Sequence, residues 1–137
     1  MLNFFSEDVD FSLSRPLKTK KWLKTTSESE GYTINELNYI FCSDEYLLEI
    51  NKQYLDHDFF TDIITFDNSE VDNQIEGDIY VSIDRVKENA ETFHTDFETE
   101  LRRVLVHGLL HLVGYADASE EQKSLMRAKE NQYLTLF

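Results

Sequence analysis

The most informative stretch of the sequence is His107-Gly-Leu-Leu-His111-Leu-Val-Gly114-Tyr-Ala-Asp117. His107 and His111 lie four residues apart in a run that is otherwise almost wholly apolar. On a helix this spacing places both imidazoles on one face, one turn apart. The apolar run therefore predicts a long buried helix over residues 95–113, which Gly114 ends.

His107, His111 and Asp117 have a spacing typical of a metal site. Gly114 can adopt a positive φ and turn the chain back toward the two histidines. Zinc accepts imidazole nitrogen and carboxylate oxygen, and three protein ligands leave a fourth position open for catalysis. From the residues alone, a metal site and a pair of satisfied core histidines both remain open.

Gly108 separates this pattern from the zinc peptidases, in which a glutamate general base follows the first histidine. Glycine cannot accept a proton, so peptidase chemistry by that route is unsupported. A zinc site can still hydrolyse an ester or a phosphodiester. The base would then come from elsewhere, and Asp78 and Asp62, at the beginnings of expected strands, are the candidates.

Length and composition predict one globular domain over residues 1–137, with 41% hydrophobic and 13% aromatic residues. No apolar run is long enough to span a bilayer, and the first residues lack the features of a signal peptide. We therefore expect a cytoplasmic protein that does not enter a membrane. Cys42 is the single cysteine, which excludes an internal disulfide and suggests a small buried side chain in a strand.

The net charge of −14 argues against nucleic-acid binding when it is taken alone. The positive charges are unevenly spread, however, and Arg102 and Arg103 lie on the histidine helix. A cluster near the N-terminus is either a local basic patch or a solvated helix face. It consists of Arg15, Lys18, Lys20, Lys21 and Lys24.

The order of the elements predicts an α+β fold, with a small mixed β-sheet of about four strands and about five helices. The metal site is expected on the long buried helix and the loop after it. Ser14 is the expected cap of the first helix, with Pro16 in its first turn. The loop over residues 55–62, which contains His57, is of the kind that carries function. Strands are expected at 2–5, 32–42, 63–66 and 77–83, and helices at 16–29, 44–54, 84–93, 95–113 and from 119 onward.

Three ordered motifs resemble the YbeY family of bacterial metal-dependent endoribonucleases. Residues 107–115 are similar to its signature His-Gly-x-Leu-His-Leu-x-Gly-Tyr-Asp-His. Residues 48–66, which include Thr61-Asp62-Ile-Ile-Thr-Phe66, resemble its second motif, and Gly77-Asp78-Ile79 resembles its Gly-Asp-Ile strand. The match covers roughly residues 45–130.

The resemblance implies a compact α+β fold, one zinc ion and single-strand-selective cleavage of RNA. It also implies a role in rRNA processing, notably maturation of the 16S rRNA 3′ end, and in ribosome quality control, with the ribosome or its small subunit as partner. His107 and His111 carry over as ligands. Asp117 stands where the family has a third histidine, and Leu55 stands where it has an arginine, so Arg103 is the candidate for the missing cation.

Two other functions compete with an endoribonuclease. One is a metal-dependent hydrolase of a non-RNA substrate, such as a small ester. The other is a ribosome-associated binding factor with weak catalysis, which the net charge and Leu55 favour.

Overall fold

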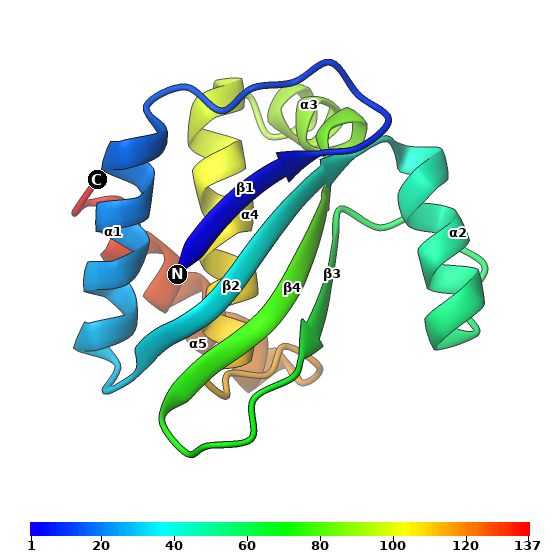
Figure 1. Ribbon diagram of the computed structural model, residues 1–137. Coiled ribbons are helices and arrows are strands. Elements are labelled where there is room, and N and C mark those ends of the chain that lie inside the picture. Colours follow the sequence, from blue (N-terminus) through cyan, green and yellow to red (C-terminus); the bar gives the residue numbers. More distant parts are fainter.

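A mixed four-stranded sheet with the order β1-β2-β4-β3 forms the frame of the computed structural model, which describes the whole chain (Figure 1). Strands β1 (Leu2–Ser6) and β4 (Gln74–Ser82) run parallel to β2 (Thr33–Cys42). Strand β3 (Ile63–Asp67) pairs antiparallel with β4 as a hairpin. Strand β3, which follows the 55–62 loop, is therefore one edge of the sheet.

Five helices accompany the sheet, so the predicted α+β fold is confirmed. In Figure 1, α4 and α5 lie behind the sheet, α1 lies to its left, and α2 lies beyond the β3 edge. No helix has the length and apolar composition that crossing a bilayer requires. The helices are α1 (Pro16–Ser29), α2 (Asp44–Leu55), α3 (Ile83–Thr92), α4 (Phe97–Leu112) and α5 (Glu120–Leu134).

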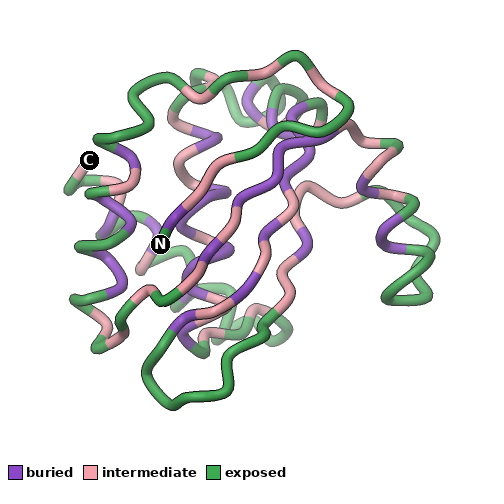
Figure 2. The backbone as a smooth tube through the Cα atoms, in the orientation of Figure 1, coloured by how far each residue is buried: buried purple, intermediate pink, exposed green.

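Helix α4 is the buried helix that the sequence predicts (Figure 2). Asp96 caps it by accepting a hydrogen bond of 2.8 Å from the Thr99 amide. Gly108 faces the sheet, where an added Cβ would lie 2.7 Å from Ile63 Cδ1. The absence of a side chain thus lets the helix approach β3 and β4 closely. Its fully buried apolar side chains include Leu101, Leu105, Leu109 and Leu110.

The beginning of α1 differs from the expectation. Arg15, with a φ of 52°, is the residue before the helix, and no side chain caps it. Ser14 instead donates a hydrogen bond of 3.1 Å to Glu98 at the beginning of α4. Pro16 occupies the first turn as expected, because its fixed φ suits that position. The predicted Ser14 cap is therefore wrong.

Of two further sequence predictions, the structure confirms one and corrects the other. Cys42 is fully buried in β2, as expected. Strand β4 begins at Gln74, three residues earlier than predicted, because Gln74 pairs with Thr33 at the beginning of β2. The polar residues before Gly77 are typical of a turn, so the sequence does not indicate this extension.

Candidate metal centre

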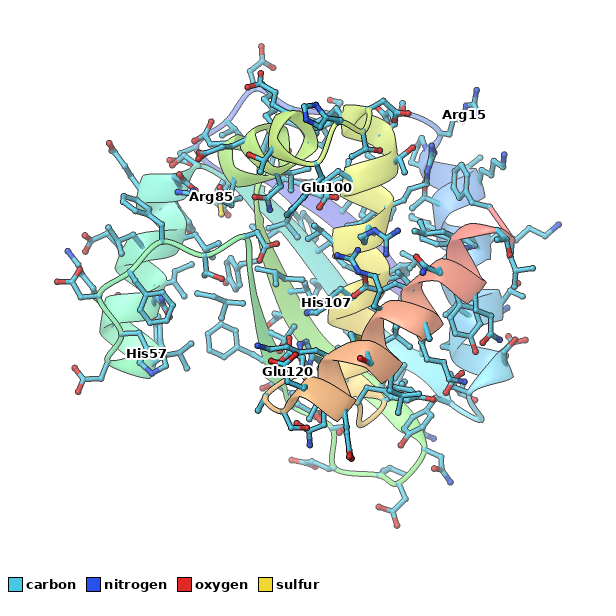
Figure 3. All side chains as sticks on the ribbon, turned by 180° about the vertical axis from the view of Figure 1, so that it is seen from behind. Arg15, His57, Arg85, Glu100, His107 and Glu120 are labelled. Atoms are coloured by element: carbon cyan, nitrogen blue, oxygen red, sulfur yellow. The ribbon has the colours of Figure 1, made fainter.

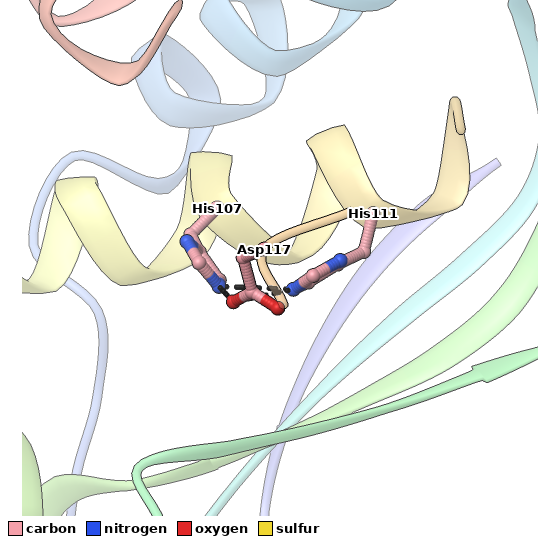
Figure 4. A group of neighbouring side chains, drawn as sticks. All are labelled: His107, His111 and Asp117. Atoms are coloured by element: carbon pink, nitrogen blue, oxygen red, sulfur yellow. Dashed lines mark hydrogen bonds and ion pairs between the residues drawn. The ribbon is translucent and has the colours of Figure 1, made fainter. Parts of the chain in front are cut away.

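Three side chains converge beside the C-terminal half of α4 (Figure 4). His107 and His111 bring their Nε2 atoms to 3.0 Å from each other. A carboxylate oxygen of Asp117 lies 3.3 Å from the first and 3.4 Å from the second. Gly114, with a φ of +107°, allows the chain to turn after the helix. The structure therefore brings the three predicted metal ligands together.

The hydrogen bonds of the two imidazoles test whether a metal fits. His107 Nδ1 lies 2.7 Å from a Glu130 oxygen, and His111 Nδ1 lies 2.9 Å from the Tyr115 carbonyl oxygen. Both neighbours are acceptors, so each Nδ1 carries the proton and each Nε2 of a neutral ring presents a lone pair. Two lone pairs and a carboxylate then face one another without a donor.

A tetrahedral ion with ligand distances of about 2.0–2.1 Å separates its ligand atoms by about 3.3 Å. The observed separations of 3.0, 3.3 and 3.4 Å bracket this value. The cluster of His107, His111 and Asp117 could accordingly hold a metal ion.

Glu130 on α5 connects the centre to a cation. Its carboxylate accepts a hydrogen bond of 2.8 Å from Arg103 in addition to the one from His107. Burial raises the pKa of Glu130, but His107 and Arg103 outweigh this effect and hold the pKa below its usual range. Burial lowers the pKa of His107, but Glu130, Asp117 and Asp62 together raise it by more, so the net shift is upward.

Glu130 was not identified from the sequence. It lies four residues after Met126 and three before Tyr133, both of which α5 buries. An acidic residue on the buried face of an amphipathic helix is uncommon without a partner. The position of Glu130 between these two buried residues could have indicated a functional role from the sequence.

A cavity of about 410 Å³ lies beside His107, between α3, α4 and α5. Figure 3 shows Glu100 and His107 along the same side of α4. The cations that line the cavity are Arg103, Lys123 and Arg127, and the carboxylates are Asp62, Glu100, Asp117 and Glu130. The cavity therefore presents both signs of charge next to the metal cluster.

Asp62 and Arg103, two of the predicted catalytic residues, line this cavity. The Asp62 carboxylate is 3.4 Å from the side-chain amide of Asn89, and its backbone carbonyl accepts from the Ser82 amide at 2.9 Å. Burial raises the pKa of Asp62, although His107 and Arg85 partly oppose the shift.

Asp78 does not reach the cavity. Its neighbours Gly77 and Ile79 face α4, as their close approach to Leu112 and Gly108 shows. Successive side chains of a strand point to opposite faces. Asp78 consequently accepts a hydrogen bond of 3.0 Å from Asn38 on the other face of the sheet. The expectation that Asp78 assists within the cleft is corrected by this alternation.

The 55–62 loop contributes less to the centre than expected. His57 stacks on Phe59, with ring centroids 5.2 Å apart, and does not line the cavity. Figure 3 shows His57 well away from His107. Leu55 is exposed at the end of α2. Of this loop, only Asp62 contributes to the cavity.

Comparisons with known proteins agree on one family. A family model described as endoribonuclease YbeY matches residues 5–137. A protein of that name from Cytophaga hutchinsonii is 57% identical over 97% of this chain and 93% of its own length. One from Christiangramia forsetii is 49% identical, with coverages of 99% and 94%. A solution structure of a Thermotoga maritima protein superposes with a TM-score of 0.67 at 31% identity, covering 98% of this chain and 87% of that one.

Proposed function

Because the chain belongs to the endoribonuclease YbeY family, we propose that it is a zinc-dependent endoribonuclease that cleaves single-stranded RNA. Its substrate is an rRNA precursor, its step includes maturation of the 16S rRNA 3′ end, and it acts in ribosome quality control. The ribosome or its small subunit is then its partner in the cytoplasm. The observation that carries the proposal is the convergence of His107, His111 and Asp117 beside a cavity with three cations.

The zinc ion would be held by Nε2 of His107, Nε2 of His111 and a carboxylate oxygen of Asp117. Nitrogen and oxygen ligands in this number suit zinc and leave a position open for substrate. When bound, zinc supplies Lewis acidity that stabilises the negative charge developing on a phosphodiester. Asp117 adds a negative charge that a third histidine would not, so the cations of the cavity gain importance.

Arg103, Arg127 and Lys123 would bind the phosphate oxygens of the substrate. Arg103 is held in place by Glu130 and by Asn131, whose side-chain oxygen is 2.9 Å from its guanidinium. A guanidinium oriented in advance stabilises phosphate charge without reorganising during the reaction. These cations provide the charge that Leu55 cannot provide.

Proton transfer is assigned to the Asp62 carboxylate. Its raised pKa brings it closer to neutrality, where a carboxylate is a more effective proton acceptor. Asp62 would take the proton of the attacking water as that oxygen bonds to phosphorus and the bond to the leaving nucleotide breaks.

The proposal is tested with metal-stripped protein and a labelled single-stranded rRNA fragment. Adding zinc should restore cleavage by the wild-type protein. The zinc affinity of His111→Ala should fall by more than about 100-fold, which is the largest loss expected when only a hydrogen-bond partner of a ligand is removed. His57→Ala is the matched control, because this exposed histidine lies outside the cavity.

Undiminished RNA cleavage by His111→Ala would show that a metal ion at this site takes no part in the reaction. Hydrolysis of a peptide or ester panel without RNA cleavage would assign the centre to another hydrolase. Binding to the small subunit that survives loss of the ligands, without cleavage, would instead indicate a binding factor.

A further inference from the structure

Six cationic side chains that form no ion pair gather on α1 and the adjacent part of α4. Among the remaining cations, only Lys87 also lacks an ion pair, whereas the others each pair with a carboxylate. We call the six residues the α1 cationic face. They are Arg15, Lys18, Lys20, Lys21, Lys24 and Arg102.

Side chains from α1 and α4 contact the same aromatic ring. Lys18 Nζ and the Arg102 guanidinium carbon each lie 4.3 Å from the ring centroid of Phe137. Phe137 in turn packs edge-on against the buried Trp22 of α1, at 5.3 Å between centroids. The nearby Glu98 is bonded to Ser14 and does not pair with these cations. Arg15 and Arg102 line one cavity with Phe137. Lys20, Lys21 and Lys24 line a second cavity beside β2, so the α1 cationic face extends around two sides of α1.

Glu28 is the one acidic residue within α1, and it lines the cavity that Lys20, Lys21 and Lys24 share. No acidic residue occurs between Asp10 and Glu28, although the chain carries 27 acidic residues against 13 basic ones. Like charges held together repel one another and destabilise the folded state. An anionic partner would remove that repulsion, and a phosphate backbone is the anion that a nuclease meets.

The face begins close to the metal centre. Arg102 precedes Arg103, which lines the cavity. Four residues lie between Arg102 and His107, which are about 7.5 Å apart along the axis of α4 and about 140° apart around it. Figure 3 shows Arg15 at the beginning of α1 and Arg85 on the opposite side of α4. The cations thus lead away from the cavity toward the side occupied by α1.

We propose that the α1 cationic face binds the sugar–phosphate backbone of the substrate RNA, a few nucleotides from the phosphate that is cleaved. This inference rests on the proposed endoribonuclease function and extends its binding site. It predicts that long strands reach the face and that short strands, which fill only the cavity, do not.

The test compares binding of single-stranded RNA of about four and about 20 nucleotides across a salt series. Removing one cation that binds a phosphate of a single strand should flatten the dependence of log affinity on log salt by about 0.7. The double variant Lys18→Gln/Arg102→Gln removes two cations, so it should flatten the dependence by about 1.4 with the long RNA alone. Lys21→Gln/Lys24→Gln, which disturbs no aromatic contact, should do the same if the first variant folds poorly.

Lys87→Gln is the matched control, since Lys87 is exposed, unpaired and outside the face. Salt slopes equal to that control in both double variants would overturn the inference while wild-type cleavage leaves the proposed function intact. No binding or cleavage of either RNA by the wild-type protein would refute both. A loss of binding to phosphatidylserine vesicles with unchanged RNA binding would assign the face to a membrane instead.

Discussion

The Tyr115 hydroxyl donates a hydrogen bond of 2.6 Å to the carboxylate of Glu30. The backbone carbonyl of the same tyrosine accepts from Nδ1 of the proposed ligand His111 at 2.9 Å. Glu30, the residue after α1, also accepts hydrogen bonds from Tyr133 and from Lys129. A carboxylate far from the metal cluster in sequence thereby fixes the loop that orients one ligand.

Removing the Tyr115 hydroxyl should weaken zinc binding. Tyr115→Phe leaves the backbone carbonyl in place but releases the loop from Glu30, so His111 is held less firmly. Loss of an outer partner typically lowers metal affinity by about 10- to 100-fold, and we expect about 10-fold here because the carbonyl remains. Competition with a chromophoric chelator measures the change. Tyr32→Phe, a hydroxyl without a hydrogen bond in the structure, is the control, and equal affinities in the two variants would contradict the prediction.

Glu30 should make stability depend on pH in one direction. Burial alone would raise the pKa of Glu30, but hydrogen bonds from Tyr115, Tyr133 and Lys129 hold it below its ordinary value. A carboxyl group with a lowered pKa in the folded state stabilises the protein at pH values above its pKa in the unfolded state. This stability is lost as the pH falls through the pKa of the folded state. In urea titrations of metal-free protein, wild type should exceed Glu30→Gln by a constant free energy from about pH 7 to about pH 5, and by less at lower pH. An advantage that grows on acidification would refute this.

The sequence could predict that His107, His111 and Asp117 meet because their placement is local. His107 and His111 need only one helix, and Asp117 needs only the turn at Gly114. Glu130 and Glu30 could not be assigned in the same way, because each reaches the centre through the packing of another helix against α4.

The misplacement of Asp78 has a different cause. Gly77-Asp78-Ile79 correctly predicts a strand, although β4 begins earlier, at Gln74. The face to which Asp78 points, however, depends on which side of the sheet carries α4. Alternation identifies Gly77 and Ile79 as one face. Only the packed structure shows that this face, and not that of Asp78, meets the histidine helix.

Neutralising Glu130 should affect His107 and Arg103 together. Glu130→Gln keeps the size of the side chain but removes the charge that both partners share. We expect zinc affinity to fall by about 10- to 100-fold, and RNA cleavage to fall further because Arg103 retains only Asn131. Glu121→Gln, an exposed carboxylate in the first turn of α5, is the control. If cleavage falls no further than zinc occupancy explains, Glu130 does not act through Arg103.

Two glycines should respond differently to alanine. At Gly108 a new Cβ would meet Ile63 Cδ1 at 2.7 Å and Ile79 at 3.1 Å, which are side-chain atoms that can shift. Overpacking of about 1–3 kcal/mol is partly offset by about 1 kcal/mol of helix propensity, leaving a net loss of about 1 kcal/mol. At Gly77 the Cβ would meet the Phe66 backbone carbonyl, which is fixed by the hairpin. Urea unfolding should therefore rank Gly77→Ala as the less stable variant, and the reverse order, or a stabilised Gly108→Ala, would show that α4 does not need this close approach to the sheet.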